Sequence, residues 1–160
     1  QRYFETLLHN SITKLDSNYP VYLESESSKI GNLHIPNKLW EKLNISERIL
    51  LKVPTEERVK FLLNEYEHLT KKNDLLEPFL KGMTGRYPNK MIVYWRDLIA
   101  NKNWGQFVKE ILENHYDPKY SFSETKHKDK IYFQIEIKKL DKLNLDKTSK
   151  KILNYINSSN

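Results

Sequence analysis

Hydrophobic side chains recur every three or four residues along most of this chain, while a few short stretches alternate apolar with polar residues. The first spacing is typical of amphipathic helices, and the second of β-strands that are buried on one face. The pattern predicts strands over 20–24, 33–35, 48–53 and 131–137. It predicts helices over 2–15, 36–43, 54–66, 75–82, 91–100 and 104–117, and a closing helix from 146.

Strands that alternate with helices favour an α/β fold with a parallel sheet, here a partial sheet of three or four strands. The consecutive helices over about 73–117 interrupt this order and are predicted to be a helical insertion or lid. Pro118 is expected to end the last of them, and the polar segment 121–130 to be a loop. At 160 residues, the chain is expected to form a single domain over 1–160.

Composition narrows the classes of function. The formal net charge of +6 favours an anionic partner such as nucleic acid or a phosphorylated ligand. The chain has no cysteine, which excludes disulfides, thiolate catalysis and cysteine metal sites within it. No apolar run approaches the length of a membrane span, and no signal peptide is visible. We therefore expect a cytoplasmic protein that has no membrane partner.

The segment 20–31, PVYLESESSKIG, joins an apolar strand to a cluster of carboxylates, hydroxyls and an ammonium group. Ligands bind at the carboxyl ends of strands in open α/β sheets, so this cluster is a candidate ligand site. The alternative is an acidic, serine-rich turn that merely leaves the sheet. The candidate side chains are those of Glu24, Glu26, Ser27 and Lys29.

Arg58 follows the strand at 48–53 within the string LLKVPTEER. In phosphate-binding kinase-like α/β proteins, a helix at such a position carries an arginine toward the ligand, where its guanidinium binds phosphate oxygens in pairs. The alternative is an exposed helix arginine paired with a nearby glutamate. A G-x-x-x-x-G-K-[ST] phosphate-binding loop is absent from the sequence.

The string HYDPKY places a possible general base, an acid and two phenols, His115, Tyr116, Asp117 and Tyr120, within six residues. A structural interpretation is equally open, with a turn at Asp117 and tyrosines that seal the lid. The segment 119–151 holds ten lysines against five acids, which fits a phosphate-backbone surface or a solvated face. The histidines show no metal-ligand spacing, so no metal site is predicted.

Several strings together resemble the C-terminal part of tRNA 2-selenouridine synthase. They are Gln1 with Phe4-Glu5, then PVYLESESSKIG, LKVPTEERVKFLLNEY and ILENHYDPKY, in that order. The resemblance implies part of a transferase that converts wobble 2-thiouridine to 2-selenouridine through a geranylated intermediate. Its substrates would be geranyl diphosphate, selenophosphate and tRNA, its partner a rhodanese-like domain, and its fold a P-loop kinase-like sheet. No cofactor is expected within this segment.

The resemblance also implies roles for the candidate residues. Glu24 and Glu26 would be catalytic, while Ser27, Lys29 and Arg58 would bind the diphosphate. The H-Y-D-P-x-Y residues match a motif of unknown role. A geranyl chain would need an apolar groove, which the helical insertion would supply through side chains such as Trp95, Trp104 or Phe107.

The chain departs from the family pattern because it has neither the rhodanese cysteine nor the Walker loop, which the family places upstream of the Q-x-x-F-E helix. We therefore expect a P-loop domain without its first strand and loop, and no activity in this segment alone. Two alternatives remain: a non-catalytic module that binds tRNA or docks a partner, and a degenerate small-molecule kinase-like domain.

Overall fold

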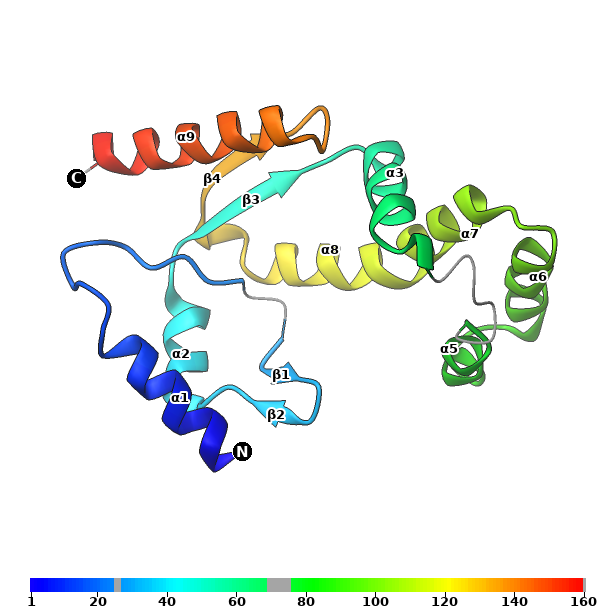
Figure 1. The fold of residues 1–160 in the computed structure, drawn as a ribbon, viewed down its shortest axis with the longest axis horizontal. Helices are drawn as coiled ribbons and strands as arrows, with labels where there is room; N and C mark the ends of the chain where they lie inside the picture. Colours follow the sequence, from blue (N-terminus) through cyan, green and yellow to red (C-terminus); the bar gives the residue numbers. More distant parts are fainter. Residues whose placement is uncertain (25–26, 69–75, 160) are drawn as a thin grey trace. The chain divides into compact units, whose positions relative to one another are not determined.

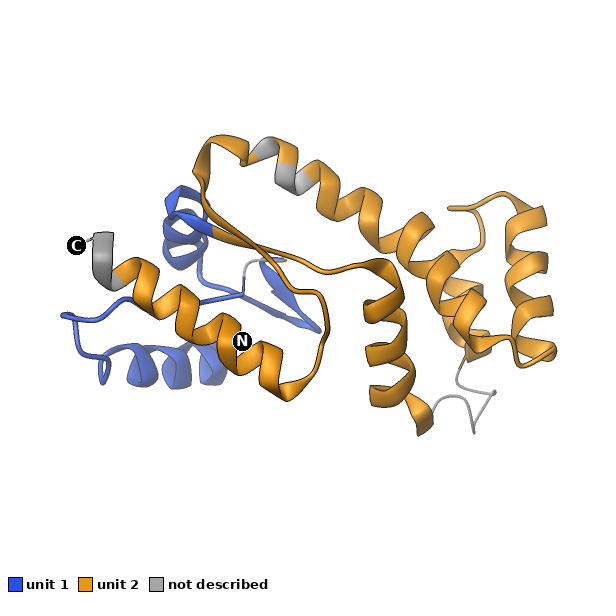
Figure 2. Ribbon diagram, turned by 90° about the horizontal axis from the view of Figure 1, so that it is seen from above, with its two compact units in different colours: residues 1–48 blue, residues 49–160 orange. Residues whose placement is uncertain are grey.

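The computed structural model describes residues 1–24, 27–68 and 76–159. The chain divides into two compact units, unit 1 over 1–48 and unit 2 over 49–160 (Figure 2). The chain is of mixed α/β type, with 63% of it helical. The single domain over 1–160 and the P-loop kinase-like fold stay predictions.

Unit 1 consists of two helices and a small hairpin. They follow in the order α1 (Arg2–Ile12), β1 (Lys29–Ile30), β2 (Leu33–His34) and α2 (Asn37–Ile45). The two strands are antiparallel, with Lys29 opposite His34. Gly31 in the turn has a φ of 60°, a left-handed conformation that glycine adopts without a steric penalty. The predicted first helix and the short strand near 33–35 are both present.

The Gln1 side chain ties the start of α1 to β2. Its amide nitrogen donates to the backbone oxygen of His34 at 2.8 Å, and its amide oxygen accepts from the backbone nitrogen of His34 at 2.9 Å. The same nitrogen lies 2.7 Å from the Glu5 carboxylate. The side-chain amide thus pairs with the edge strand as a neighbouring peptide group would.

The predicted strand over 20–24 is wrong. Residues 21–24 form neither helix nor strand, and the side chains of Val21, Tyr22 and Leu23 are exposed. A strand needs a partner for its backbone groups, and in the described part of unit 1 the only paired strands are β1 and β2. The side chains of this stretch favour a β-strand, but its backbone has no partner strand among the described residues.

Unit 2 contains a small parallel sheet of two strands, β3 (Arg48–Lys52) and β4 (Ile131–Glu136) (Figure 1). The backbone nitrogen of Ile137 donates to the Lys52 oxygen at 2.8 Å. Side chains in β4 alternate between covered and exposed, as predicted, and Ile135 is buried. The parallel sheet is confirmed, but within the described residues it has two strands rather than three or four.

Helices make up most of unit 2, and most of them lie between β3 and β4. That the helices over about 73–117 are an insertion stays a prediction. A π-helical turn joins α7 directly to α8, and α9 follows β4. In chain order the helices are α3 (Thr55–Glu65), α5 (Leu76–Met83), α6 (Asn89–Ala100), α7 (Trp104–Ile111), the π-helix η2 (Leu112–Tyr116), α8 (Asp117–Lys126), the 3₁₀-helix η3 (Lys128–Lys130) and α9 (Lys142–Ser159).

Two predictions near Pro118 are wrong. The helix does not end there, and the segment 121–130 is not a loop, because α8 runs to Lys126. Pro118 is the second residue of α8 and directly follows the π-helical turn η2. The preceding π-helical turn has i→i+5 geometry, which widens the backbone before the proline ring.

The hydrophobic core lies among the helices of unit 2. Trp95 is fully buried at its centre, with 0% of its surface exposed. Side chains from α5, α6 and α7 surround it: Leu76, Leu80, Met83, Ile92, Leu98, Ile99, Phe107 and Ile111. These residues occupy the helical spacings seen in the sequence, and burying each one stabilises the fold by roughly 1.5–3 kcal/mol.

None of the described helices is long and apolar enough to cross a membrane.

Candidate functional site

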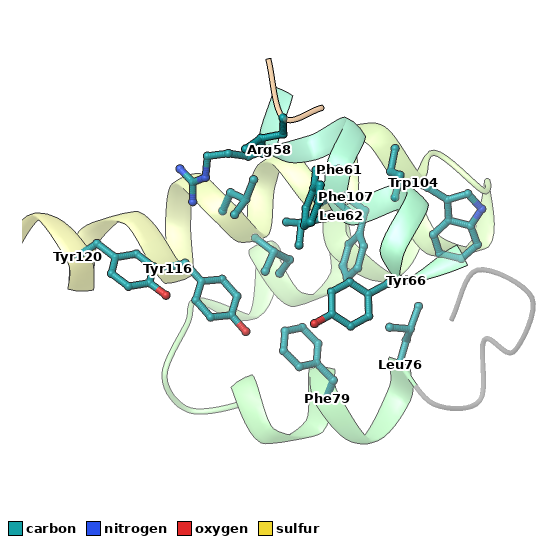
Figure 3. Close-up of a pocket in the computed structure, with 15 residues that line it drawn as sticks. Arg58, Phe61, Leu62, Tyr66, Leu76, Phe79, Trp104, Phe107, Tyr116 and Tyr120 are labelled. Atoms are coloured by element: carbon teal, nitrogen blue, oxygen red, sulfur yellow. The ribbon is translucent and has the colours of Figure 1, made fainter. Parts of the chain in front are cut away.

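A pocket of about 660 Å³ opens among the helices of unit 2 (Figure 3). Its volume falls within the range of small-molecule sites in proteins. Aliphatic and aromatic side chains form most of the wall. The lining residues are Arg58, Phe61, Leu62, Leu63, Tyr66, Leu76, Phe79, Trp104, Phe107, Val108, Ile111, Leu112, Tyr116, Tyr120 and Leu140.

The apolar wall is a product of helical periodicity. On α3, Leu62 and Phe61 lie beside Tyr66, the residue that caps the C-terminal end of this helix, and all three line the pocket. In α7, Trp104, Phe107 and their neighbours form a second apolar stripe. The sequence predicts both apolar faces, but the spacing of hydrophobic residues does not show that a pocket forms between the two helices.

The aromatic residues predicted for a groove have different locations. Trp104 and Phe107 line the pocket, as predicted. Trp95 does not belong to its wall, because this side chain is fully buried in the core. Its ring packs against Tyr87, with the ring centroids 5.2 Å apart. The role predicted for Trp95 is therefore wrong.

Arg58 lies at one end of the pocket, opposite the end formed by Leu76 and Trp104 (Figure 3). Its guanidinium donates to the Asp117 carboxylate at 2.7 Å. The two side chains are 25% and 31% exposed, so the pair lies in a partly desolvated position. Arg58 is thus paired with an acid, but the partner is an aspartate 59 residues away rather than a nearby glutamate.

Three residues of the H-Y-D-P-x-Y motif face this end of the pocket. Tyr116 and Tyr120 line the wall beside Arg58 (Figure 3), and Asp117 binds the guanidinium. Tyr116 and Tyr120 are one helical turn apart, which places both rings on the same side of the helix. The structure therefore brings Arg58 together with this motif, two groups that the sequence separates.

His115 points to different partners and is buried, with 8% of its surface exposed. Its Nδ1 lies 2.7 Å from the Tyr87 hydroxyl, and its Nε2 lies 3.1 Å from Lys119 Nζ. An ammonium group only donates, so Nε2 accepts and Nδ1–H donates to the Tyr87 oxygen. Burial, Lys119 and Arg86 all lower the pKa of His115. The imidazole is therefore neutral at pH 7.

The candidate residues of the segment 20–31 belong to unit 1. Glu24 is exposed and follows an irregular stretch rather than a strand. The Ser27 hydroxyl accepts from the backbone nitrogen of Lys29 at 3.1 Å, and Lys29 is exposed in β1. Glu26 lies outside the described residues. The catalytic and ligand-binding roles predicted for these four residues remain predictions.

Among the described residues, no group of three or more His, Asp or Glu side chains is placed to hold a metal ion. Of the described residues that line the pocket, Arg58 is the one with a cationic side chain, and the others offer phenol hydroxyls, the indole of Trp104 and apolar surface. Such a set of side chains suits an organic ligand with a long apolar part and an anionic end.

The chain matches the family of the tRNA 2-selenouridine synthase AAA domain over residues 1–83. No curated protein and no solved structure matches it. The matched region contains all of unit 1 and continues through β3, α3 and α5, so it includes Arg58 and part of the pocket wall. Because this match spans more than half of the 160 residues, the chain belongs to the family of tRNA 2-selenouridine synthase AAA domains.

Proposed function

We propose that this chain contributes the prenyl-donor site of a tRNA 2-selenouridine synthase, and that the pocket of unit 2 binds geranyl diphosphate. One observation carries the proposal: an apolar pocket of about 660 Å³ has an arginine at one end. The geranyl chain would lie against the aliphatic and aromatic wall. The diphosphate would lie at the Arg58 end, beside Tyr116 and Tyr120 (Figure 3).

The physical chemistry of the two ends supports this orientation. Each methylene group removed from water contributes about 0.8 kcal/mol, so an apolar wall favours an isoprenoid chain. A guanidinium binds phosphate oxygens in pairs. The Asp117 carboxylate at 2.7 Å holds Arg58 in place before a ligand arrives. Because the Arg58 side chain is already held in one conformation, it loses less conformational entropy when it binds an anion.

The proposed reaction is transfer of the geranyl group to the sulfur of 2-thiouridine. The sulfur lone pair attacks the first carbon of the geranyl chain, and the new C–S bond replaces the C–O bond to diphosphate. Diphosphate leaves with the bonding electrons, and Arg58 stabilises the negative charge that develops on it. The N3 proton of the thiouridine passes to the released diphosphate or to water, so the S-geranyl product is neutral, with a C2=N3 double bond. Selenophosphate would then supply selenium in a later step, with a rhodanese-like domain as partner.

The test is a calorimetric titration of the chain with geranyl diphosphate. Phe61 lines the pocket and is partly exposed, so Phe61→Ser should weaken binding about tenfold or more while the fold is retained. Phe122 is 74% exposed on α8 and does not line the pocket, so Phe122→Ser is the matched control. Equal dissociation constants for the wild type and Phe61→Ser would reject the proposed site.

We also propose that the chain binds tRNA through exposed lysines in α9 and in the segment just before this helix. The lysines Lys138, Lys139, Lys142, Lys147, Lys150 and Lys151 are all exposed. Such a surface favours the phosphate backbone of a nucleic acid, and its affinity should fall as salt rises. If the chain is a binding module rather than part of an enzyme, this surface alone would account for its function.

Filter binding at several salt concentrations tests the lysine surface. Replacing Lys147, Lys150 and Lys151 with Gln should weaken tRNA binding and make the slope of log affinity against log salt shallower by about 0.7–0.9 per lost contact. The matched control replaces Lys14, Lys38 and Lys42, which are exposed in unit 1. If the two triple variants show the same slope of log affinity against log salt, the lysines of α9 do not bind tRNA.

A further inference from the structure

Lys119 and Arg86 lie close to the buried His115 in the structure or the sequence, and neither has a carboxylate partner among the described residues. Lys119 donates to His115 Nε2 at 3.1 Å. Arg86 directly precedes Tyr87, whose hydroxyl lies 2.7 Å from His115 Nδ1, and its charge lowers the pKa of the same imidazole. Neither side chain forms an ion pair with any acid in the described ranges. Because the imidazole is neutral, it orients the ammonium group without cancelling its charge. This cluster of positive charge is available to an anion.

The cluster lies next to the pocket rather than elsewhere on unit 2. Lys119 Nζ is 6.0 Å from the ring centroid of Tyr116, which lines the pocket. Tyr116 and Tyr120 share one side of the helix, and residues 117 and 119 flank that side in opposite directions. Asp117 binds Arg58 on one flank. Lys119 therefore brings a second cation to the other flank of the same two tyrosines.

We propose that Lys119 and Arg86 bind one phosphoryl group of a diphosphate whose other phosphoryl group is bound by Arg58. The inference rests on the proposed function and deepens it, because it makes the site selective for a diphosphate over a single phosphate. Arg58 alone shares its charge with Asp117 and cannot balance a diphosphate. Cations on both flanks of Tyr116 and Tyr120 supply the missing charge.

Inorganic diphosphate and orthophosphate are the probes, titrated into the full chain. Lys119→Met keeps the aliphatic stem and removes the charge, so it should weaken diphosphate binding about tenfold and orthophosphate binding by much less. Arg86→Met should act in the same direction, and Lys119→Arg should restore most of the affinity. Lys90→Met, at an exposed position in the first turn of α6, is the matched control. Wild-type affinity for diphosphate in Lys119→Met would overturn the inference.

The same titrations separate this inference from the proposed function. If Phe61→Ser weakens geranyl diphosphate binding and Lys119→Met does not, the prenyl site stands and the second phosphate subsite is wrong. If Lys119→Met weakens inorganic diphosphate binding but the geranyl group adds no affinity, the subsite stands and the prenyl site is wrong. If Lys119→Met lowers tRNA affinity and leaves diphosphate affinity unchanged, the anion is nucleic acid and the inference is overturned.

Discussion

Unit 1 and unit 2 contain apolar residues at similar helical spacings but bury them very differently. In the described part of unit 1, no side chain is fully buried, and Leu7 on α1 is 48% exposed. In unit 2 the equivalent stripe of α6 holds Ile92, Trp95 and Ile99 in the core. The comparison shows that periodicity identifies the apolar face of a helix and not the surface that covers it.

The family match covers unit 1 completely, although the buried core lies in unit 2. It includes all of unit 1 and ends at Met83, while α6, α7 and most of the core lie beyond it. The matched region therefore contains Leu76, Leu80 and Met83 of the core and none of the core residues on α6 and α7.

The largest effect should come from truncating the centre of the core. Trp95→Ala should lower the free energy of unfolding by about 3–5 kcal/mol, because it leaves a cavity that the packed helices cannot fill. Leu7→Ala on α1 should lower it by less than about 1 kcal/mol. Denaturant titration measures both values. If the two variants lose similar amounts of unfolding free energy, the two units do not differ in how their apolar residues stabilise the fold.

A smaller, pH-dependent effect should come from His115. Its pKa is lowered in the folded chain, so the unfolded chain binds more protons near pH 6 and stability falls as the pH drops below about 6.5. His115→Gln removes this proton linkage, although losing its buried hydrogen bonds costs about 1–2 kcal/mol at neutral pH. The melting temperature should therefore fall less between about pH 7.5 and 5.5 in this variant.

The matched control for His115 is His9→Gln, which changes an exposed histidine on α1. This variant keeps the buried His115, so it should still show the loss of thermal stability on acidification that the burial of His115 causes. If instead His115→Gln and the wild type show parallel melting curves across this pH range, the burial of His115 does not contribute to the pH dependence.

The smallest effect should be local to unit 1. Gln1→Ala removes both hydrogen bonds to the His34 backbone, which are exposed and contribute roughly 0.5–1.5 kcal/mol each at most. Hydrogen exchange at the His34 amide should become faster, while the amides of α6 keep their protection. Faster exchange throughout α6 would mean that the two units unfold together rather than separately.

Much of the secondary structure follows from the sequence because local patterns determine it. The alternating residues of β4 and the apolar stripes of α3, α6 and α7 were all predicted. The strand over 20–24 failed because pairing depends on a second segment. The prediction that the helix ends at Pro118 failed because this proline follows a π-helical turn within a continuous helix, and hydrophobic spacing does not reveal such a turn.

The candidate site was predicted in part. The sequence indicated Arg58, Trp104 and Phe107 as separate candidates, and all three line one pocket. It did not indicate that Asp117 is the partner of Arg58, because 59 residues separate them and the contact depends on how α3 packs against α7, the helix that leads through the π-helical turn into α8. Contacts of this kind depend on tertiary packing. A single sequence indicates which face of each helix is apolar, but not which faces meet.

The π-helical turn at Leu112–Tyr116 changes the rotational phase of the long helix that contains α7 and α8. In a regular α-helix each residue advances by about 100°, so one extra residue in a turn shifts everything after it by that angle. The apolar stripe of α7 and the Tyr116, Tyr120 pair thus face the same pocket although regular spacing would not align them. Deleting Asn114 from this turn would rotate Tyr116, Asp117 and Tyr120 away from Arg58 and the apolar wall, with none of these side chains altered.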